Sequence, residues 1–264
     1  MDSIPYFIVD AFTDRPFAGN PAAVVLLESW PQDAWLANVA MEMNLSETAF
    51  LVPRNGGFDL RWFTPKVEVD LCGHATLASA AALAHTLQLT DGATVEFSTR
   101  SGVLPVARNG SRFRLDFPAT PEKPAPSPDG LAQAVGVSPT YVGKSKFDYL
   151  VEVKDAQTVR EMLPDFRRLA GVQCRGVIVT AANDRPEFDF ISRFFAPAAG
   201  IDEDPVTGSA HCCLAEFWGR RLGKTRMTAF QASARGGVVD IELRENRVIL
   251  GGSGVVVAAG EFLH

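Results

Sequence analysis

Cysteine, histidine and long apolar runs are all scarce in this sequence. Its 264 residues include four Cys and four His, and four cysteines are too few for a disulfide scaffold. No apolar stretch approaches the roughly 20 residues that cross a bilayer, although residues 77–84 form one of the longest. No basic segment precedes an apolar one near Met1, so we expect no signal peptide, no membrane association, reduced thiols and a cytoplasmic location.

Positive charge is also in the minority. The chain has 25 Lys and Arg against 31 Asp and Glu, which gives a net charge of −6. A sequence-wide basic field is therefore absent, and we expect no nucleic-acid partner. Hydrophobic residues make up 47% and charged residues 21%, as is usual for a globular protein.

Several common site signatures are missing too. The sequence has no Gly-x-Gly-x-x-Gly, Walker or Gly-x-Ser-x-Gly motif. The Gly-rich stretch 251–254 follows a predicted strand but opens no helix, which makes it a weak phosphate loop. The histidines show no zinc-ligand spacing with the cysteines, so no metal site is predicted; they are His74, His85, His211 and His264.

Short apolar segments alternate with turn signals along the chain. The patterns predict strands at 4–12, 22–27, 48–52, 58–63, 94–98, 102–108, 112–117, 149–153 and 177–180. They predict helices at 31–44, 73–89, 131–135 and 156–163. Because segment 73–89 is apolar on nearly every side, we expect that helix to be buried. Five prolines within 118–128 predict an extended linker.

The two halves of the chain repeat each other. RWFTP at 61–65 matches RFFAP at 193–197, 132 positions later, and RSGV at 100–103 matches RGGV at 235–238, 135 positions later. Gly73 pairs with Gly208 at that second offset. We interpret this as a duplicated α+β unit, each copy a curved sheet around its own helix. The predicted domains are 1–117, with strand 256–264 as a candidate addition, and 118–255.

In each copy, a polar loop leads into the start of an apolar helix. A helix N-terminus presents unpaired N–H groups and positive potential, and a glycine there lets an anion approach the backbone. Two such termini, at Gly73 and Gly208, can together form one carboxylate site between the domains. The alternative is that both loops are ordinary helix caps.

The side chains in these loops suit proton chemistry. His74 can transfer a proton or donate a hydrogen bond, or simply cap the helix. Asp204 and Ser209 can contact substrate, or serve the helix as caps. Cys72 can act as a thiolate at the helix start, but a buried structural thiol is favoured. Thr207 occupies the matching position, so the second copy lacks that thiol. Cys212 and Cys213 are predicted to lie in the core.

Glu47 is a further candidate. It lies between a predicted helix and a predicted strand, flanked by Leu45, Ala49 and Phe50. Partial burial there is expected to raise its pKa, as a general acid/base near neutral pH requires. An exposed turn glutamate or a capping acid is the alternative.

Six stretches together resemble the PhzF-like family of phenazine biosynthesis. They are 10–14 (DAFTD), 17–24 (FAGNPAAV), 44–50 (NLSETAF), 61–65 (RWFTP), 72–77 (CGHATL) and 203–210 (EDPVTGSA). The resemblance implies a fold like that of diaminopimelate epimerase: two similar domains, each a curved, mostly antiparallel sheet or barrel around a central helix, with the site between them. This agrees with the duplication.

The resemblance also implies an isomerase that needs no cofactor and acts on a small anionic metabolite. The family's proton-shuttling glutamate falls on Glu47, and two further catalytic positions fall on His74 and Asp204. The implied substrate-binding positions are Gly73, Gly208, Ser209, Cys72, Asn20 and Ser46. By family analogy, and because two-fold dimers are common, we expect a homodimer.

Two alternatives stay open. Epimerases of the wider fold use two thiols, one at each helix start, and the pair Cys72 and Thr207 disfavours that mechanism here. A non-catalytic binding or interaction protein could keep the fold and the glycines. The joint presence of Glu47, His74 and Asp204 favours an enzyme over such a binder.

Overall fold

The computed structural model describes residues 3–263 and divides the chain into two compact units. Unit 1 comprises Met1–Asp116 and Gly251–His264, and unit 2 comprises Phe117–Leu250. The sequence predicts boundaries after residues 117 and 255, and the structure divides the chain after residues 116 and 250. His264 lies outside the described residues.

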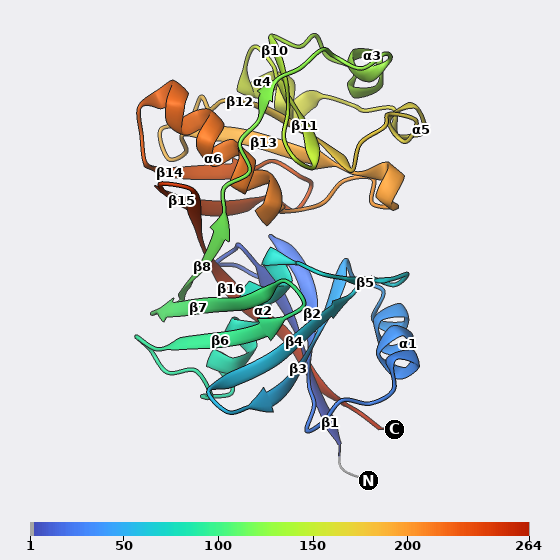
Figure 1. Cartoon of the computed structure of the whole chain (residues 1–264), viewed down its shortest axis with the longest axis vertical. Coiled ribbons are helices and arrows are strands. Elements are labelled where there is room, and N and C mark those ends of the chain that lie inside the picture. The colour runs from blue at the N-terminus through green and yellow to red at the C-terminus, as the bar shows by residue number, and fades with distance from the viewer. Residues whose placement is uncertain (1–2, 264) are drawn as a thin grey trace. The chain divides into compact units, whose positions relative to one another are not determined.

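Unit 1 contains most of the first repeat and the end of the chain (Figure 1). Its elements are β1 (Ile4–Ala11), β2 (Asn20–Leu26), α1 (Asp33–Met43), β3 (Glu47–Arg54), β4 (Gly57–Phe63), β5 (Glu68–Val69), α2 (Gly73–His85), β6 (Thr94–Thr99), β7 (Gly102–Asn109), β8 (Arg112–Pro118) and the later part of β16 (Arg247–Phe262).

The strands of unit 1 close on themselves. They run in the order β1-β2-β3-β4-β6-β7-β8-β16, and β16 pairs again with β1. Two of these pairings are parallel, β2 with β3 and β4 with β6. The result is a mostly antiparallel eight-stranded barrel, the closed form that removes exposed sheet edges.

Helix α2 forms the core of this barrel, among its strands in Figure 1. Ten of its 13 residues are buried, as expected for a helix that is apolar on all sides. Gly252 and Gly254 let β16 run close to it, because a Cβ on Gly254 would lie 2.8 Å from the Ala81 Cβ. Gly252 and Gly254 therefore serve close packing inside this barrel.

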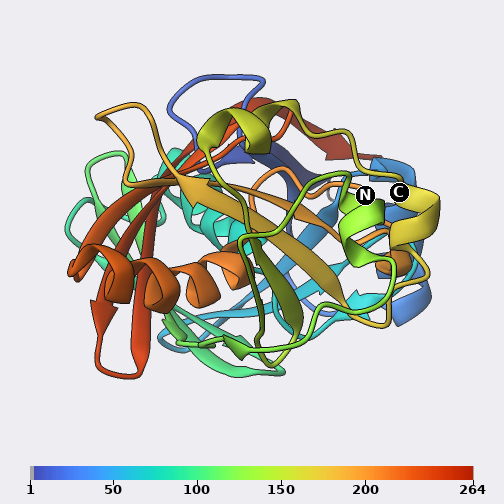
Figure 2. The same ribbon diagram turned by 90° about the horizontal axis from the view of Figure 1, so that it is seen from above.

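Unit 2 carries the second repeat. Its elements are β9 (Lys123–Pro124), α3 (Leu131–Val135), β10 (Tyr141–Lys144), β11 (Asp148–Glu152), α4 (Ala156–Glu161), α5 (Phe166–Leu169), β12 (Gly176–Ala182), β13 (Phe190–Phe195), the 3₁₀ helix η1 (Pro197–Ala199), α6 (Gly208–Leu222), β14 (Arg226–Gln231) and β15 (Gly237–Arg244), together with the start of β16. Figure 2 shows α6 alongside β14 and β15.

The strand pairings of unit 2 repeat those of unit 1. The run β11-β12-β13-β14-β15 alternates parallel, antiparallel, parallel and antiparallel pairs, and β2-β3-β4-β6-β7 shows the same alternation. In both runs the central helix follows the third strand. The predicted fold class, two similar α+β units each with a sheet around a helix, is confirmed.

Two sequence-based expectations need correction. The helix predicted at 73–89 ends at His85, because Leu87 adopts a left-handed backbone conformation with φ of 62°. The proline-rich segment 118–128, predicted as an extended linker, belongs to unit 2. It contains β9, and the buried Glu122 accepts hydrogen bonds from Arg220 and Tyr141.

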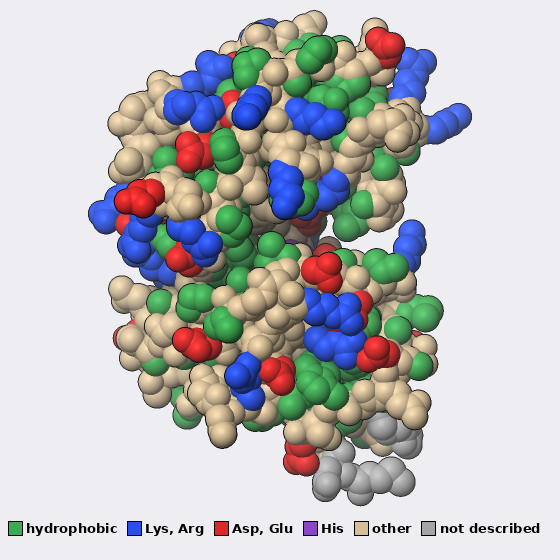
Figure 3. Space-filling view, viewed as in Figure 1, with side chains coloured by type: hydrophobic (Ala, Val, Ile, Leu, Met, Phe, Trp, Pro, Cys, Tyr) green, Lys and Arg blue, Asp and Glu red, His purple; other side chains and the backbone are tan. Residues whose placement is uncertain are grey.

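The surface carries charged side chains of both signs. Acidic and basic side chains are interspersed over the face shown in Figure 3. Within residues 3–263, the helices are all too short or too polar to cross a membrane.

Candidate functional site

The first group of candidate residues gathers where two parallel strands and helix α2 all begin. Asn20 is the first residue of β2, Glu47 the first of β3, and Gly73 the first of α2. Strands β2 and β3 pair in parallel with Ala22 opposite Glu47, so their starting ends lie together. The fold thus collects residues that are far apart in the sequence.

Contacts around His74 define the geometry of this group. Its Nε2 lies 3.1 Å from Glu47 Oε2, and its Nδ1 lies 3.1 Å from the amide nitrogen of Asn20. The Cys72 sulfur lies 3.6 Å from the same Nδ1. The side chains of His74 and Glu47 are only 6% and 12% exposed. The expected partial burial of Glu47 is present, and the imidazole is held on both sides.

Charge on this group depends on the neighbours. Burial lowers the pKa of His74, but the acidic groups of Cys72 and Glu47 outweigh burial and raise that pKa well above its ordinary value. Burial, reinforced by the Glu47 carboxylate, raises the pKa of the Cys72 thiol. At neutral pH we therefore expect a protonated Cys72 thiol beside a protonated His74 ring.

The start of α2 faces the same place. Cys72, the residue before the helix, makes no side-chain capping bond, and its backbone is extended. The first N–H groups of a helix have no partner within it and can bind an anion. Ser46 is half-buried directly before Glu47.

One residue that shapes this end of the barrel was missed in the sequence. Asp10 is buried in β1, and its Oδ2 accepts a hydrogen bond of 2.7 Å from the Phe17 backbone. Phe17 and Gly19 both have left-handed backbone angles, with φ of 65° and 64°. Asp10 therefore holds a strained turn that leads directly into Asn20. In the sequence, Asp10 could have been recognised as a carboxylate within an otherwise apolar strand.

The second group lies in unit 2, at the start of α6. Asp204 Oδ2 accepts a hydrogen bond of 2.5 Å from the Thr207 hydroxyl, and Gly208 begins the helix. The buried Gln231 braces this loop: its Nε2 donates to the Asp204 carbonyl and its Oε1 accepts from the Thr207 backbone. Sequence reasoning also missed Gln231. In the sequence, Gln231 could have been recognised as a polar residue on the buried face of β14, the face that also carries Met227 and Ala229.

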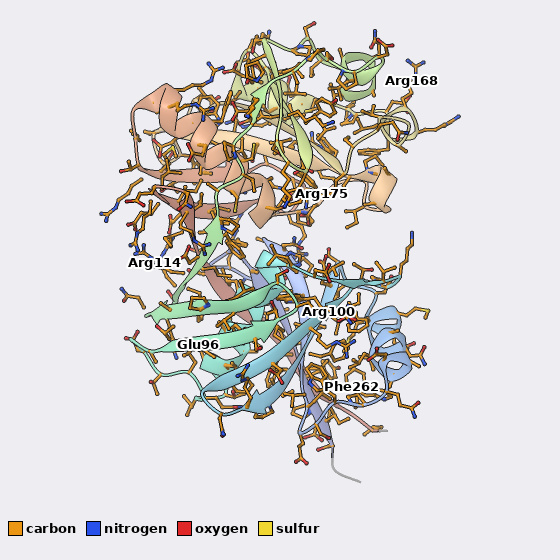
Figure 4. The ribbon with its side chains drawn as sticks, in the orientation of Figure 1. Glu96, Arg100, Arg114, Arg168, Arg175 and Phe262 are labelled. Carbon is orange, nitrogen blue, oxygen red and sulfur yellow. The ribbon has the colours of Figure 1, made fainter. Side chains whose placement is uncertain are left out.

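Ser209 connects Arg175 to this group. Its hydroxyl accepts a 3.0 Å hydrogen bond from Arg175, labelled in Figure 4, which also forms a bidentate pair with the buried Asp148. Burial raises the pKa of Asp148, although Arg175 opposes this. Arg175 stays partly exposed, and its positive charge is paired with Asp148.

An ion pair is repeated in both units. Arg61 binds Glu68 through two hydrogen bonds of 2.7 Å, and Arg193 binds Glu203 in the same way at 2.7 and 2.8 Å. Their separations, from 61 to 193 and from 68 to 203, reproduce the offsets of 132 and 135. In unit 2 this pair fixes the side chain of Glu203, which directly precedes Asp204.

His211 lies inside α6 and belongs to the core. Its Nδ1 lies 2.8 Å from the Thr207 carbonyl, while its Nε2 is buried without a hydrogen-bond partner. Burial lowers the pKa of this ring to about 4, although the carbonyl opposes the change. The ring is therefore neutral in the folded protein at neutral pH, and Nδ1 donates the hydrogen bond. The predicted core positions of Cys212 and Cys213 are confirmed.

Acid should therefore destabilise the protein through His211. The unfolded state takes up a proton near pH 6.5, while the folded state does so only near pH 4, so stability falls as the pH drops through that window. From pH 6.5 to 5 the loss is about 2 kcal/mol. Urea unfolding of His211→Gln should show a flatter pH dependence, whereas exposed His85→Gln should not. Equal slopes in wild type and His211→Gln would contradict this.

The structure thus brings Glu47, Cys72, His74 and Asn20 together in unit 1. It brings Asp204, Gly208 and Ser209 together in unit 2. The expectation that no metal-ligand set exists was based on spacing between His and Cys alone. Glu47 was outside that comparison, and one of its carboxylate oxygens lies within 4.8 Å of the Cys72 sulfur and of a His74 nitrogen.

The chain is similar to known proteins. A family model described as phenazine biosynthesis-like protein, PhzC-PhzF, matches residues 9–260. An uncharacterized isomerase of Halalkalibacterium halodurans is 48% identical over the full length of both chains. The crystal structure of a PhzF-family protein from Enterococcus faecalis superposes with a TM-score of 0.95 at 44% identity, again over 100% of both chains.

More distant structures define the fold class. A probable proline racemase from Agrobacterium radiobacter has a TM-score of 0.67 at 11% identity, and covers 98% of this chain and 92% of its own. Relatives named isomerases define this chain as an isomerase, and its fold is also that of the probable proline racemase. The chain belongs to the PhzC-PhzF family of phenazine biosynthesis-like proteins.

Proposed function

We propose that this isomerase moves a proton between two carbons of a small carboxylate-bearing metabolite, with Glu47 as the acid/base. The observation that carries the proposal is the Glu47–His74 pair at 3.1 Å, mostly buried beside the start of α2. A carboxylate there can take a proton from carbon and return it to another carbon. His74 would hold that carboxylate in place.

Free N–H groups at the start of α2, from Gly73 onward, would bind the substrate carboxylate. Negative charge spreads into that carboxylate when the neighbouring carbon loses its proton, so the same groups would stabilise the intermediate. Cys72, Asn20 and Ser46 would line this part of the site.

Unit 2 carries the other residues that we propose for catalysis and binding. The proposed residues are Asp204 as a second catalytic group, with Gly208 and Ser209 binding substrate. Arg175 holds the Ser209 hydroxyl by a hydrogen bond at that helix start.

Hydrogen exchange in D₂O tests the proposal. The protein is incubated with a panel of amino, hydroxy and unsaturated carboxylic acids, and NMR follows the replacement of carbon-bound hydrogen by deuterium. We expect catalysed exchange in at least one compound. Binding of several acids without exchange in any of them would instead favour a binding protein of the same fold.

Replacing Cys72 with Ser separates this mechanism from that of a two-thiol epimerase. The raised pKa keeps the thiol protonated, and Thr207 offers no second thiol, so we expect Cys72→Ser to reduce the exchange rate by less than about 10²-fold, the lower range for loss of an acid/base group. The exchange assay provides the measurement. Lost activity in Cys72→Ser, with activity kept in Glu47→Gln, would support the epimerase instead.

A further inference from the structure

Unit 2 has its own group of side chains where unit 1 has the group around His74. In unit 1 the group occupies the first residue of β2, the first residue of β3 and the second residue of α2. The corresponding places in unit 2 are the first residue of β11, the residue directly before β12 and the second residue of α6. They hold Asp148, Arg175 and Ser209. In each unit, 27 positions separate the first two places.

Arg175 links the other two members of this second group. Its Nε and Nη2 donate to the two carboxylate oxygens of Asp148, and the same Nη2 donates to the Ser209 hydroxyl at 3.0 Å. The Asp148 side chain is only 1% exposed. A bidentate arginine–carboxylate pair has a defined geometry. The buried carboxylate therefore fixes the guanidinium group, and the guanidinium group in turn fixes the hydroxyl.

Two aromatic rings add to this support. The central carbon of the Arg175 guanidinium lies 4.9 Å from the centre of the Phe147 ring and 5.7 Å from that of the Phe194 ring. Phe194 is buried, and Gly176 makes room for its ring, because a Cβ at that position would collide with it. Guanidinium groups stack favourably on aromatic faces. Arg175 is therefore held in one place although it is partly exposed.

This support decides how the Ser209 hydroxyl can act. An arginine only donates hydrogen bonds, so the Ser209 oxygen is the acceptor from Arg175. Its hydrogen is left over, and among residues 3–263 it has no acceptor. In α2, by contrast, the hydroxyls of Thr76 and Ser79 donate to backbone carbonyls of their own helix. The half-buried Ser209 thus offers a donor to a bound molecule.

We propose that Arg175, anchored by Asp148, is a positioning residue that holds Ser209 so that its hydroxyl donates a hydrogen bond to an oxygen of the substrate, in a carboxylate or a carbonyl group. This inference rests on the proposed role of Ser209 in substrate binding. The group in unit 2 serves binding rather than proton transfer, because an arginine stays charged and cannot act as a base.

A double variant tests this role without leaving a buried charge. Arg175→Met alone would isolate the Asp148 carboxylate, so Asp148→Asn is added, and the methionine keeps an apolar stem between the two rings. NMR titration with the panel of acids measures binding in the Glu47→Gln background. We expect about 10-fold weaker binding of the acid that exchanges, the effect of losing one hydrogen bond to a charged group. Ser209→Ala should show the same loss, and the two changes together should cost less than about 2-fold more.

A second variant and a matched control complete the design. Arg175→Lys keeps the charge beside Asp148 but not the fork that also reaches Ser209, so we expect the same loss of affinity. With Glu47 intact, the loss should appear mainly as a higher KM, which general damage to the fold would not single out. The control is Arg160→Met with Asp184→Asn, an exposed pair just beyond the other end of β12, which should bind as the parent protein does.

The outcomes distinguish this inference from the proposed function. If the Arg175 variants bind as tightly as the parent protein, or if their loss adds fully to that of Ser209→Ala, the inference is overturned whatever Glu47 does. If they bind weakly while Glu47→Gln exchanges deuterium at the full rate, only the assignment of Glu47 is wrong. If none of the acids binds, both proposals are overturned.

Discussion

Replacing Glu47 with Gln is expected to lower the isomerisation rate about 10³-fold, within the range attributed to a general acid/base. The amide keeps the size of the side chain and can still accept a hydrogen bond from His74, so the barrel should stay folded. It cannot take up a proton from carbon. Rates measured by NMR on the substrate found in the exchange screen, with circular dichroism to check folding, provide the test.

The matched control is Glu42→Gln, the same change on an exposed position of α1. It should leave the rate unchanged. A Glu47→Gln protein within 10-fold of wild type would remove Glu47 from the chemistry, because loss of an acid/base group costs at least about 10²-fold.

Replacing Arg193 with Met should destabilise unit 2 by about 3 kcal/mol, the cost of leaving one member of a buried ion pair alone. The Arg193 and Glu203 side chains are 12% and 19% exposed, so water can do little to solvate an abandoned Glu203. Arg193 also donates a 2.9 Å hydrogen bond to the Met162 carbonyl, which would lose its partner. Urea unfolding measures the change.

Arg160 provides the comparison within the same unit. It pairs with Asp184, whose side chain is 56% exposed, so Arg160→Met should cost no more than about 1 kcal/mol. The double variant Arg193→Met with Glu203→Gln should recover part of the loss, because the isolated buried charge is gone. Equal costs for Arg193→Met and Arg160→Met would contradict the account of the repeated pair.

The duplication could be predicted because its markers have local causes. A glycine at a helix start and an arginine in a strand each serve one structural need, and both recur in register at Gly73 and Gly208, and at Arg61 and Arg193. The buried helix was predicted for the same reason, since α2 is apolar on all sides. Its end was not, because the left-handed turn at Leu87 carries no glycine to mark it.

The residues of the site could be predicted one by one, but their contacts could not. Glu47 and His74 are 27 positions apart, and only the parallel pairing of β2 with β3 and the packing of α2 bring them within 3.1 Å. Asp10 and Gln231 hold loops by hydrogen bonds to backbone groups. The sequence does not show which backbone groups a side chain will reach. The closeness of Glu47 to Cys72 and His74 could not be predicted either, because spacing rules compare neighbours along the chain.

The most direct test of the central claim is to locate the deuterium that enters the product in D₂O, with wild type, Glu47→Gln and Glu42→Gln measured side by side. If Glu47 carries the proton, wild type and Glu42→Gln place deuterium at the carbon that gains hydrogen, and Glu47→Gln places none above the uncatalysed background. Undiminished deuterium uptake in Glu47→Gln would contradict the account.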